Sequence, residues 1–139
     1  MNAARQWFAW ALTAWAIGVA GAWGAIDPGE YTPVTQTELI ANKDQFQGKK
    51  VRITGVFLFT GSDFCYQIRK TKINTRDYFC FALGTPSLVR LYLKKDHPQA
   101  DQLLNLRRGT QVTAYGTFDF LGADYNFMVV DGFTVEGPE

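Results

Sequence analysis

The chain has 139 residues, of which 47% are hydrophobic and 19% are charged, with 14 Lys and Arg against 13 Asp and Glu. This length is enough for one domain, and this composition is typical of a packed globular core, which excludes an intrinsically disordered chain. The formal net charge of +1 excludes a protein that is drawn to nucleic acid or to an anionic membrane by its overall charge.

Residues 1–25 differ from the rest of the chain, because a long apolar stretch follows the single charged residue, Arg5. The stretch has the length of the apolar region of a signal peptide, and the small residues at 20–22 and 24 suit a signal peptidase. We therefore predict a signal peptide and an exported protein, in the periplasm or outside the cell. The alternative is an uncleaved inner-membrane anchor with the domain facing the periplasm, because 7–23 are almost long enough to cross a membrane.

The next segment leads into the folded domain. Residues 26–34 contain two prolines and a glycine, which predicts a linker or an extended arm before a domain at 35–139. Thr35 and Glu38 have the spacing of a capping box, so we expect a short helix to begin there and to end at Gly48.

The hydrophobic pattern then changes to the period of two that is typical of strands. A first strand is predicted at 51–59, with Gly55 as a natural site for a bend. A second strand is predicted at 78–83 and a third at 88–94, and the turn at 84–87 joins these two into a hairpin.

A helix and a final hairpin complete the chain. We expect the helix to be capped by Asp96 or His97, with Pro98 in its first turn, and to end at Gly109. Two strands joined by a short turn follow, at 110–121 and 125–136.

This order predicts an all-β fold with short helices: a five-stranded OB-fold Greek-key barrel (β-β-β-α-β-β) preceded by a short N-terminal helix. At this point the sequence resembles bacterial exported OB-fold domains akin to the tRNA-anticodon-binding type. The resemblance spans roughly residues 35–136 and lies in three segments, FQGKKVRITG (46–55), VRLYL (89–93) and LRRGTQVTAYG (106–116). These motifs are structural, so the resemblance implies the fold and no catalytic residue.

The two cysteines, Cys65 and Cys80, lie in the domain predicted to be exported, where thiols are normally oxidised. Their positions are symmetric about a polar turn near 72–75, so a hairpin would place them opposite each other. We predict a cross-strand disulfide. A redox-active or metal-binding pair is disfavoured because the sequence has no Cys-x-x-Cys spacing and no histidine nearby, and we expect no metal or other cofactor.

Candidate ligand-binding residues follow from the alternation along the strands. If the apolar residues point into the barrel, their neighbours point outward and mix tyrosine with arginine. Barrels of this kind bind ligands on the outer face of their second and third strands and with two loops. The outward-facing strand residues and the loop residues together give the candidates Arg52, Arg69, Lys70, Lys72, Arg76, Tyr78, Arg90, Tyr92, Tyr115 and Tyr125.

No catalytic constellation can be assembled, since the chain has a single histidine, His97, and no glycine-rich phosphate loop. We therefore expect a non-catalytic binding or adaptor module of the cell envelope, whose partner is a protein, a peptide or a glycan. Two alternatives stay open. One is an exported protein that binds single-stranded nucleic acid through tyrosine stacking and basic loop residues. The other is a structural subunit of an oligomer that pairs through an exposed strand edge.

Overall fold

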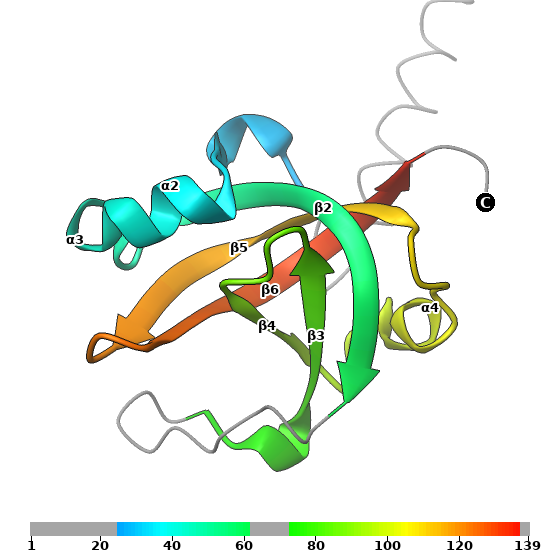
Figure 1. The fold of residues 1–139 in the computed structure, drawn as a ribbon. Coiled ribbons are helices and arrows are strands. Elements are labelled where there is room, and N and C mark those ends of the chain that lie inside the picture. Colours follow the sequence, from blue (N-terminus) through cyan, green and yellow to red (C-terminus); the bar gives the residue numbers. More distant parts are fainter. Residues whose placement is uncertain (1–24, 62–72, 137–139) are drawn as a thin grey trace, which may run out of the picture.

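The computed structural model describes residues 25–61 and 73–136, which form a barrel flanked by short helices (Figure 1). The barrel strands are β2 (Lys50–Gly61), β3 (Tyr78–Gly84), β4 (Arg90–Lys94), β5 (Gln111–Leu121) and β6 (Tyr125–Glu136). The other elements are η1 (Pro28–Glu30), β1 (Thr32–Pro33), α2 (Gln36–Ala41), α3 (Lys43–Phe46), η3 (Thr75–Asp77) and α4 (Ala100–Leu104). The predicted signal segment, 1–25, lies outside the described residues except for Ala25.

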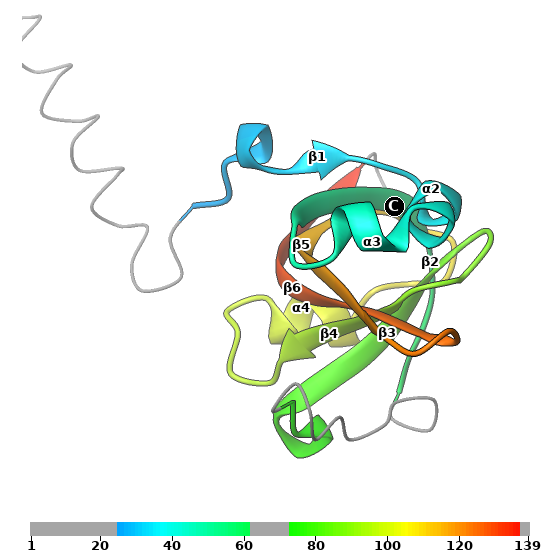
Figure 2. The same ribbon diagram turned by 90° about the vertical axis from the view of Figure 1, so that its left-hand side faces the viewer.

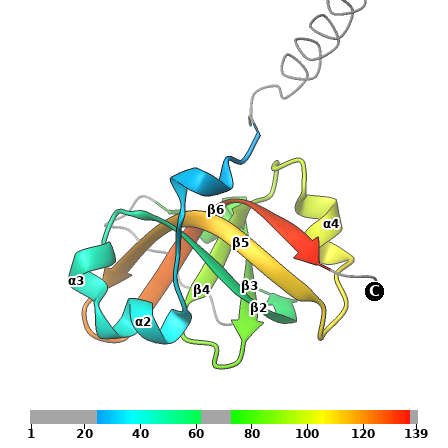
Figure 3. The same ribbon diagram turned by 90° about the horizontal axis from the view of Figure 1, so that it is seen from above.

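The five long strands close in the order β2-β3-β4-β6-β5, and β5 pairs back onto β2. Strands β4 and β6 run parallel, whereas the other neighbouring pairs in the barrel run antiparallel. With α4 between the third and fourth barrel strands, this confirms the predicted five-stranded OB-fold barrel. Helices α2 and α3 lie on one side of the barrel and α4 lies on the other (Figure 3).

The barrel interior is one apolar cluster, and it contains the inward-facing positions that the alternation predicts. Helix α2 adds Leu39 and helix α4 adds Leu103, both without exposed surface. These two leucines anchor the short helices, which lack the length to be stable alone. The strand residues in the cluster or packed on it include Val51, Ile53, Phe79, Phe81, Leu83, Val89, Leu91, Leu93, Val112 and Ala114.

Strand β2 bends where the sequence predicts it, at Gly55. The strand pairs with β5 up to Val56 and with β3 from Val56 onward, so it turns from one neighbour to the next at this point (Figure 1). A Cβ atom on Gly55 would lie 2.4 Å from the carbonyl oxygen of Gly84. The close approach of the two backbones therefore requires glycine at this bend.

The capping box at the start of α2 is confirmed. The hydroxyl of Thr35 accepts the backbone N–H of Glu38, and the Glu38 carboxylate accepts the backbone N–H of Thr35. The helix is shorter than predicted, because the backbone leaves the helical region at Asn42 and a separate turn, α3, follows. Gly48 adopts a left-handed φ of 73° after α3, as suits a residue that ends a helical segment.

The predicted third strand also begins later than expected, at Arg90 rather than Leu88. The backbone N–H groups of Leu88 and Val89 both donate to the side-chain oxygen of Gln36, at 2.7 and 2.9 Å. The side-chain nitrogen of Gln36 donates in turn to the carbonyl of Leu83 at 2.9 Å. The buried side-chain amide of Gln36 thus supplies the hydrogen bonds that a neighbouring strand would otherwise make at the β3–β4 turn.

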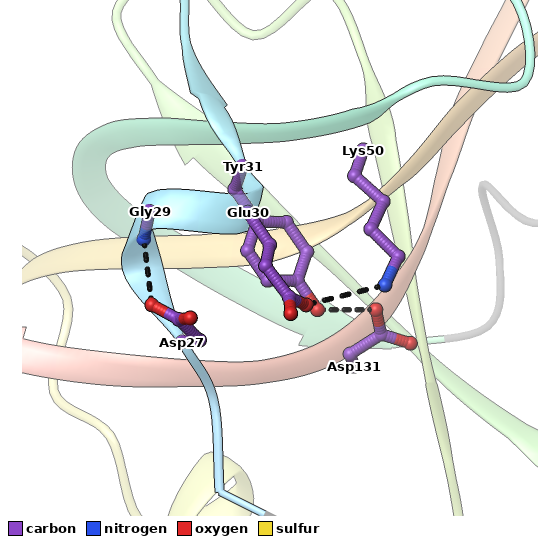
Figure 4. A network of polar contacts seen from close by, with 6 residues as sticks. All are labelled: Asp27, Gly29, Glu30, Tyr31, Lys50 and Asp131. Atoms are coloured by element: carbon purple, nitrogen blue, oxygen red, sulfur yellow. Dashed lines mark hydrogen bonds and ion pairs between the residues drawn. The ribbon is translucent and has the colours of Figure 1, made fainter.

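The segment predicted to be a linker or an extended arm, 26–34, packs on the barrel, and we refer to it as the N-terminal arm. Its strand β1 pairs in parallel with β2, and Figure 2 shows the two side by side. The ring of Tyr31 is 5% exposed and meets Tyr115 edge to face, with 5.3 Å between ring centroids. Its hydroxyl donates to the carboxylate of Asp131 at 2.8 Å (Figure 4). Composition indicated an extended segment, but burial of this one aromatic ring holds it in place.

Replacing Tyr31 by phenylalanine should remove the bond that fastens the arm. We expect Tyr31→Phe to lower the free energy of unfolding at pH 7 by about 1–2 kcal/mol, because the hydroxyl bonds to a charged acceptor. Burial, together with the hydrogen bond to Asp131 and its charge, raises the pKa of Tyr31 above its ordinary value. The folded state therefore favours the neutral phenol. This stabilisation is complete below the unfolded pKa of about 10 and is lost at higher pH.

Urea unfolding at pH 7 and at steps from pH 9 to pH 11 measures both effects. The difference in stability between the wild type and Tyr31→Phe should shrink as the pH rises past 10. A constant difference across this range would show that Tyr31 does not titrate with unfolding. Asp131→Asn, which keeps an acceptor and removes the charge, should weaken the pH dependence as well.

Helix α4 begins at Ala100 with Gln99 as its N-cap, so the prediction of a cap at Asp96 or His97 was wrong. The helix also ends at Leu104, before Gly109. His97 is buried, and its Nδ1 accepts the backbone N–H of Gln99 at 2.9 Å. Its Nε2 therefore carries the proton and donates to the carbonyl of Asp131 at 2.7 Å. The imidazole links the loop before α4 to β6, which explains its burial.

The register of β2 and β3 differs from the one predicted for the two cysteines. Cys80 lies opposite Gly61 in the ladder, so a hairpin register centred between residues 72 and 73 was wrong. In the observed register the residue opposite Cys80 is Gly61, which precedes Cys65 in the sequence. Cys80 is buried and is not a free thiol. Cys65 lies outside the described residues, so its disulfide with Cys80 stays a prediction.

Candidate functional site

The predicted site residues divide into three groups in the structure. Arg69, Lys70 and Lys72 lie outside the described residues, and the exposed Arg76 lies in η3 beside them in the sequence. A second group, Tyr78, Arg90, Tyr92 and Tyr125, gathers on the outer face of β3, β4 and β6. A third group, Arg52 and Tyr115, lies on β2 and β5, away from the strands expected to carry the site.

Tyr92 was predicted to be available to a ligand, and this is wrong, because its side chain has no exposed surface. It points away from the barrel core into a second apolar cluster with Ile73, Cys80 and Phe127. Tyr78 packs on its edge, with 6.0 Å between ring centroids. The alternation along β4 was correct, but the outer face of this strand is covered by other side chains. Tyr92 is therefore unable to stack on a base or a sugar.

The remaining members of this face already contact one another. The guanidinium of Arg90 lies 4.8 Å from the centroid of the Tyr125 ring, and the hydroxyls of Tyr92 and Tyr125 are in contact. Both Arg90 and Tyr125 are half-buried. The Arg90 guanidinium therefore already makes a cation–π contact within the protein.

The third group lines a groove of about 480 Å³ on the outside of the barrel, between the N-terminal arm with α2 and the strands β2, β5 and β6. We call it the Arg52 groove. In the antiparallel register Arg52 lies opposite Tyr115, and Thr54 lies opposite Thr113. The full lining is Pro33, Val34, Thr35, Glu38, Arg52, Thr54, Thr113, Tyr115 and Glu136.

Arg52 is half-buried and lines this groove. Within 25–61 and 73–136, no side chain makes a hydrogen bond or an ion pair with it. The opposite residue, Tyr115, was predicted to be exposed but is 6% exposed, because the Tyr31 ring covers it. Tyr115 therefore forms part of the groove floor, and Arg52 supplies the cation that a ligand would meet.

The other side of the groove presents oxygen atoms. Thr113 is 5% exposed, and its hydroxyl donates to the carboxylate of Glu136 at 3.4 Å. The hydroxyls of Thr54 and Thr113 are 2.7 Å apart. With the Thr113 proton directed to Glu136, the Thr54 hydroxyl is the donor of this pair. The chain of hydrogen bonds runs from Thr54 through Thr113 to Glu136. In this arrangement the oxygen atoms of Thr54 and Glu136 offer lone pairs, and no free hydroxyl proton, to the groove.

The sequence pattern singled out Arg52 and Tyr115, and it missed Glu38, Thr113 and Glu136. These residues come from α2, β5 and the end of β6, so only the closed barrel and the docked arm bring them together. Cross-strand register would have indicated Thr113, since it lies opposite the outward-facing Thr54. No local signal pointed to the two carboxylates.

Two further properties of the described residues bear on function. No group of three or more His, Cys, Asp or Glu side chains among them is placed to hold a metal ion. In the same part of the chain, no helix has the length and apolar character to cross a membrane.

Comparisons with known proteins support the fold. No protein-family model matches the chain, and no curated protein sequence matches it. Two structures of asparaginyl-tRNA synthetase from Pyrococcus horikoshii, one complexed with asparaginyl-adenylate, match 73% of the chain at 16% identity and a TM-score of 0.53. A proposed aspartyl-tRNA synthetase from Leishmania major Friedlin matches 80% at 13% identity and a TM-score of 0.55.

The chain spans about a fifth of the length of these synthetases, 21 to 22%. At such low identity the likeness establishes the shape of the backbone and carries no residue role. The chain is therefore an OB-fold barrel that resembles one part of asparaginyl- and aspartyl-tRNA synthetases.

Proposed function

We propose that this protein is a non-catalytic binding module of the bacterial cell envelope, which recognises a protein, a peptide or a glycan through the outer face of its barrel. Export to the periplasm or beyond is part of the proposal and rests on the composition of residues 1–25. The observation that carries it is the Arg52 groove, where the half-buried Arg52 has no hydrogen-bond or ion-pair partner among the described side chains. An arginine without a partner side chain can pair with an anionic group of a ligand.

Two observations favour binding over catalysis and over the nucleic-acid alternative. Both ring nitrogens of His97 already make hydrogen bonds within the protein, so the sole histidine is not placed to act as a general base. Base stacking on the predicted face loses Tyr92, whose side chain has no exposed surface, and Tyr125 already packs on the guanidinium of Arg90.

Crosslinking in intact cells tests the proposal. The full tagged chain is crosslinked in its native envelope, and the captured material is identified by mass spectrometry. We expect one specific envelope component, lost at least tenfold in Arg52→Gln. Arg107→Gln, which removes an exposed arginine outside the groove, is the matched control and should retain capture.

Arg90→Gln tests the other face of the barrel in the same experiment. Capture that is lost in Arg90→Gln and kept in Arg52→Gln would move the site to the face of β3 and β4. Absence of any specific component would contradict the proposal as a whole. Urea unfolding should show Arg52→Gln within about 0.5 kcal/mol of the wild type, because its side chain makes no polar bond to the described side chains.

A further inference from the structure

The Arg52 groove offers opposite charges to its ligand at two places, and we propose that it binds a short zwitterionic ligand of the peptide class. A carboxylate of the ligand pairs with the guanidinium of Arg52, and an ammonium group binds the oxygen-rich side formed by Thr54 and Glu136. This inference rests on the proposed function and names the ligand class of the same groove.

The guanidinium determines one end of the ligand. Arginine presents its N–H groups in a planar fork that matches the two oxygens of a carboxylate. Arg52 extends from β2, a strand that is hydrogen-bonded to β5 on one side and to β1 on the other near this residue, so its backbone is fixed. A ligand carboxylate would supply the acceptor that no described side chain supplies.

The chain of hydrogen bonds from Thr54 through Thr113 to Glu136 indicates the chemical group at the other end of the ligand. Because protons run from Thr54 to Thr113 and on to Glu136, both ends of the chain present only acceptors to the groove. An ammonium group carries three donors and a positive charge, which suits a threonine oxygen beside a carboxylate. The Glu136 carboxylate can only accept, which gives the chain this direction.

The balance of charge excludes a simple anion. Arg52 contributes one positive charge, and Glu38 and Glu136 contribute two negative charges to the lining. One oxygen of Glu38 accepts the backbone N–H of Thr35, and one oxygen of Glu136 accepts the hydroxyl of Thr113, so each carboxylate keeps one oxygen for a cation. We place the ammonium group at Glu136 because this carboxylate ends the hydrogen-bonded chain of threonines. A phosphate or a nucleic-acid backbone would meet net negative charge, whereas a zwitterion satisfies both signs.

The size of the groove fits this class of ligand. A volume of about 480 Å³ lies within the range of sites for small molecules. The side chains of Pro33 and Val34 line the groove beside the polar groups and offer apolar surface to the body of the ligand. A peptide of a few residues presents such a body between its two charged ends.

Binding of trialanine with free termini to the full chain tests the inference, with microscale thermophoresis as the readout. N-acetyl-trialanine and trialanine amide each lack one terminal charge, and each should bind about tenfold more weakly. Maltotriose and inorganic phosphate are compared under the same conditions and should not compete with trialanine.

Two variants assign each charge to its partner through double-mutant cycles. In Arg52→Gln, the affinity for trialanine should fall about tenfold, and amidation of the C-terminus should have no further effect. In Glu136→Gln, acetylation of the N-terminus should have no further effect. Arg107→Gln should bind trialanine as the wild type does.

The outcomes separate this inference from the proposed function. Absence of trialanine binding would overturn the proposal of a zwitterionic ligand. Binding of the two capped peptides as tight as that of trialanine would overturn it as well. Arg52-dependent binding of maltotriose would overturn it in favour of a glycan and leave the binding module intact. If trialanine does not bind but capture by crosslinking in the envelope still depends on Arg52, the proposed ligand class is wrong and the proposed function stands.

Discussion

Replacing Gln36 by alanine should destabilise the protein by about 3 kcal/mol. The side chain of Gln36 is 7% exposed and makes three hydrogen bonds, to the carbonyl of Leu83 and to the N–H groups of Leu88 and Val89. Alanine leaves these backbone groups without partners beneath α2, and each buried group left unpaired costs about 1–3 kcal/mol. Urea unfolding followed by circular dichroism measures the loss as a lower midpoint at an unchanged slope.

Two further substitutions in α2 make this result specific. Thr37 is the next residue and is exposed, so Thr37→Ala should change stability by less than about 0.5 kcal/mol. Gln36→Glu keeps the size and the acceptor and replaces the donor that faces the Leu83 carbonyl, so it should also be clearly destabilising. Equal stability of Gln36→Ala and Thr37→Ala would show that the amide does not hold the β3–β4 turn.

Gly55→Ala should lower the free energy of unfolding by about as much as Gln36→Ala does. In Gly55→Ala the new Cβ would lie 2.4 Å from the carbonyl oxygen of Gly84 and 3.2 Å from the Cβ of Leu83. Backbone atoms on the neighbouring strand have to move to accept it, and overpacking of this kind costs about 1–3 kcal/mol. We expect a loss at the upper end of this range, because the contact closes the barrel at the bend of β2.

Gly61, on the same strand, is the matched control. A Cβ on Gly61 would meet no atom within 4 Å, so Gly61→Ala should leave the free energy of unfolding within about 0.5 kcal/mol of the wild type. Urea unfolding of both variants gives the comparison. A Gly55→Ala protein as stable as Gly61→Ala would mean that β2 and β3 separate at the bend without cost.

The exposure of the outward-facing residues Arg52 and Tyr92 differs, although the alternation of their strands predicts the same for both. Alternation placed Arg52 and Tyr92 on the outer side of their strands in the same way, and both do leave the core. Their exposure differs because Phe127 and Ile73 cover Tyr92, whereas no side chain covers the guanidinium of Arg52 completely. Alternation gives the direction of a side chain, and it does not indicate what lies above it.

The sequence by itself determined the five barrel strands, the capping box at Thr35 and the bend at Gly55, because each depends on residues close together in the chain. Only the tertiary structure decided that the arm docks through Tyr31, that Gln36 bonds to the β3–β4 turn and that Arg52 and Glu136 share a groove. These contacts join residues separated by about 50 to 100 positions. Their partners are chosen by barrel closure and by the burial of polar groups, which no local periodicity records.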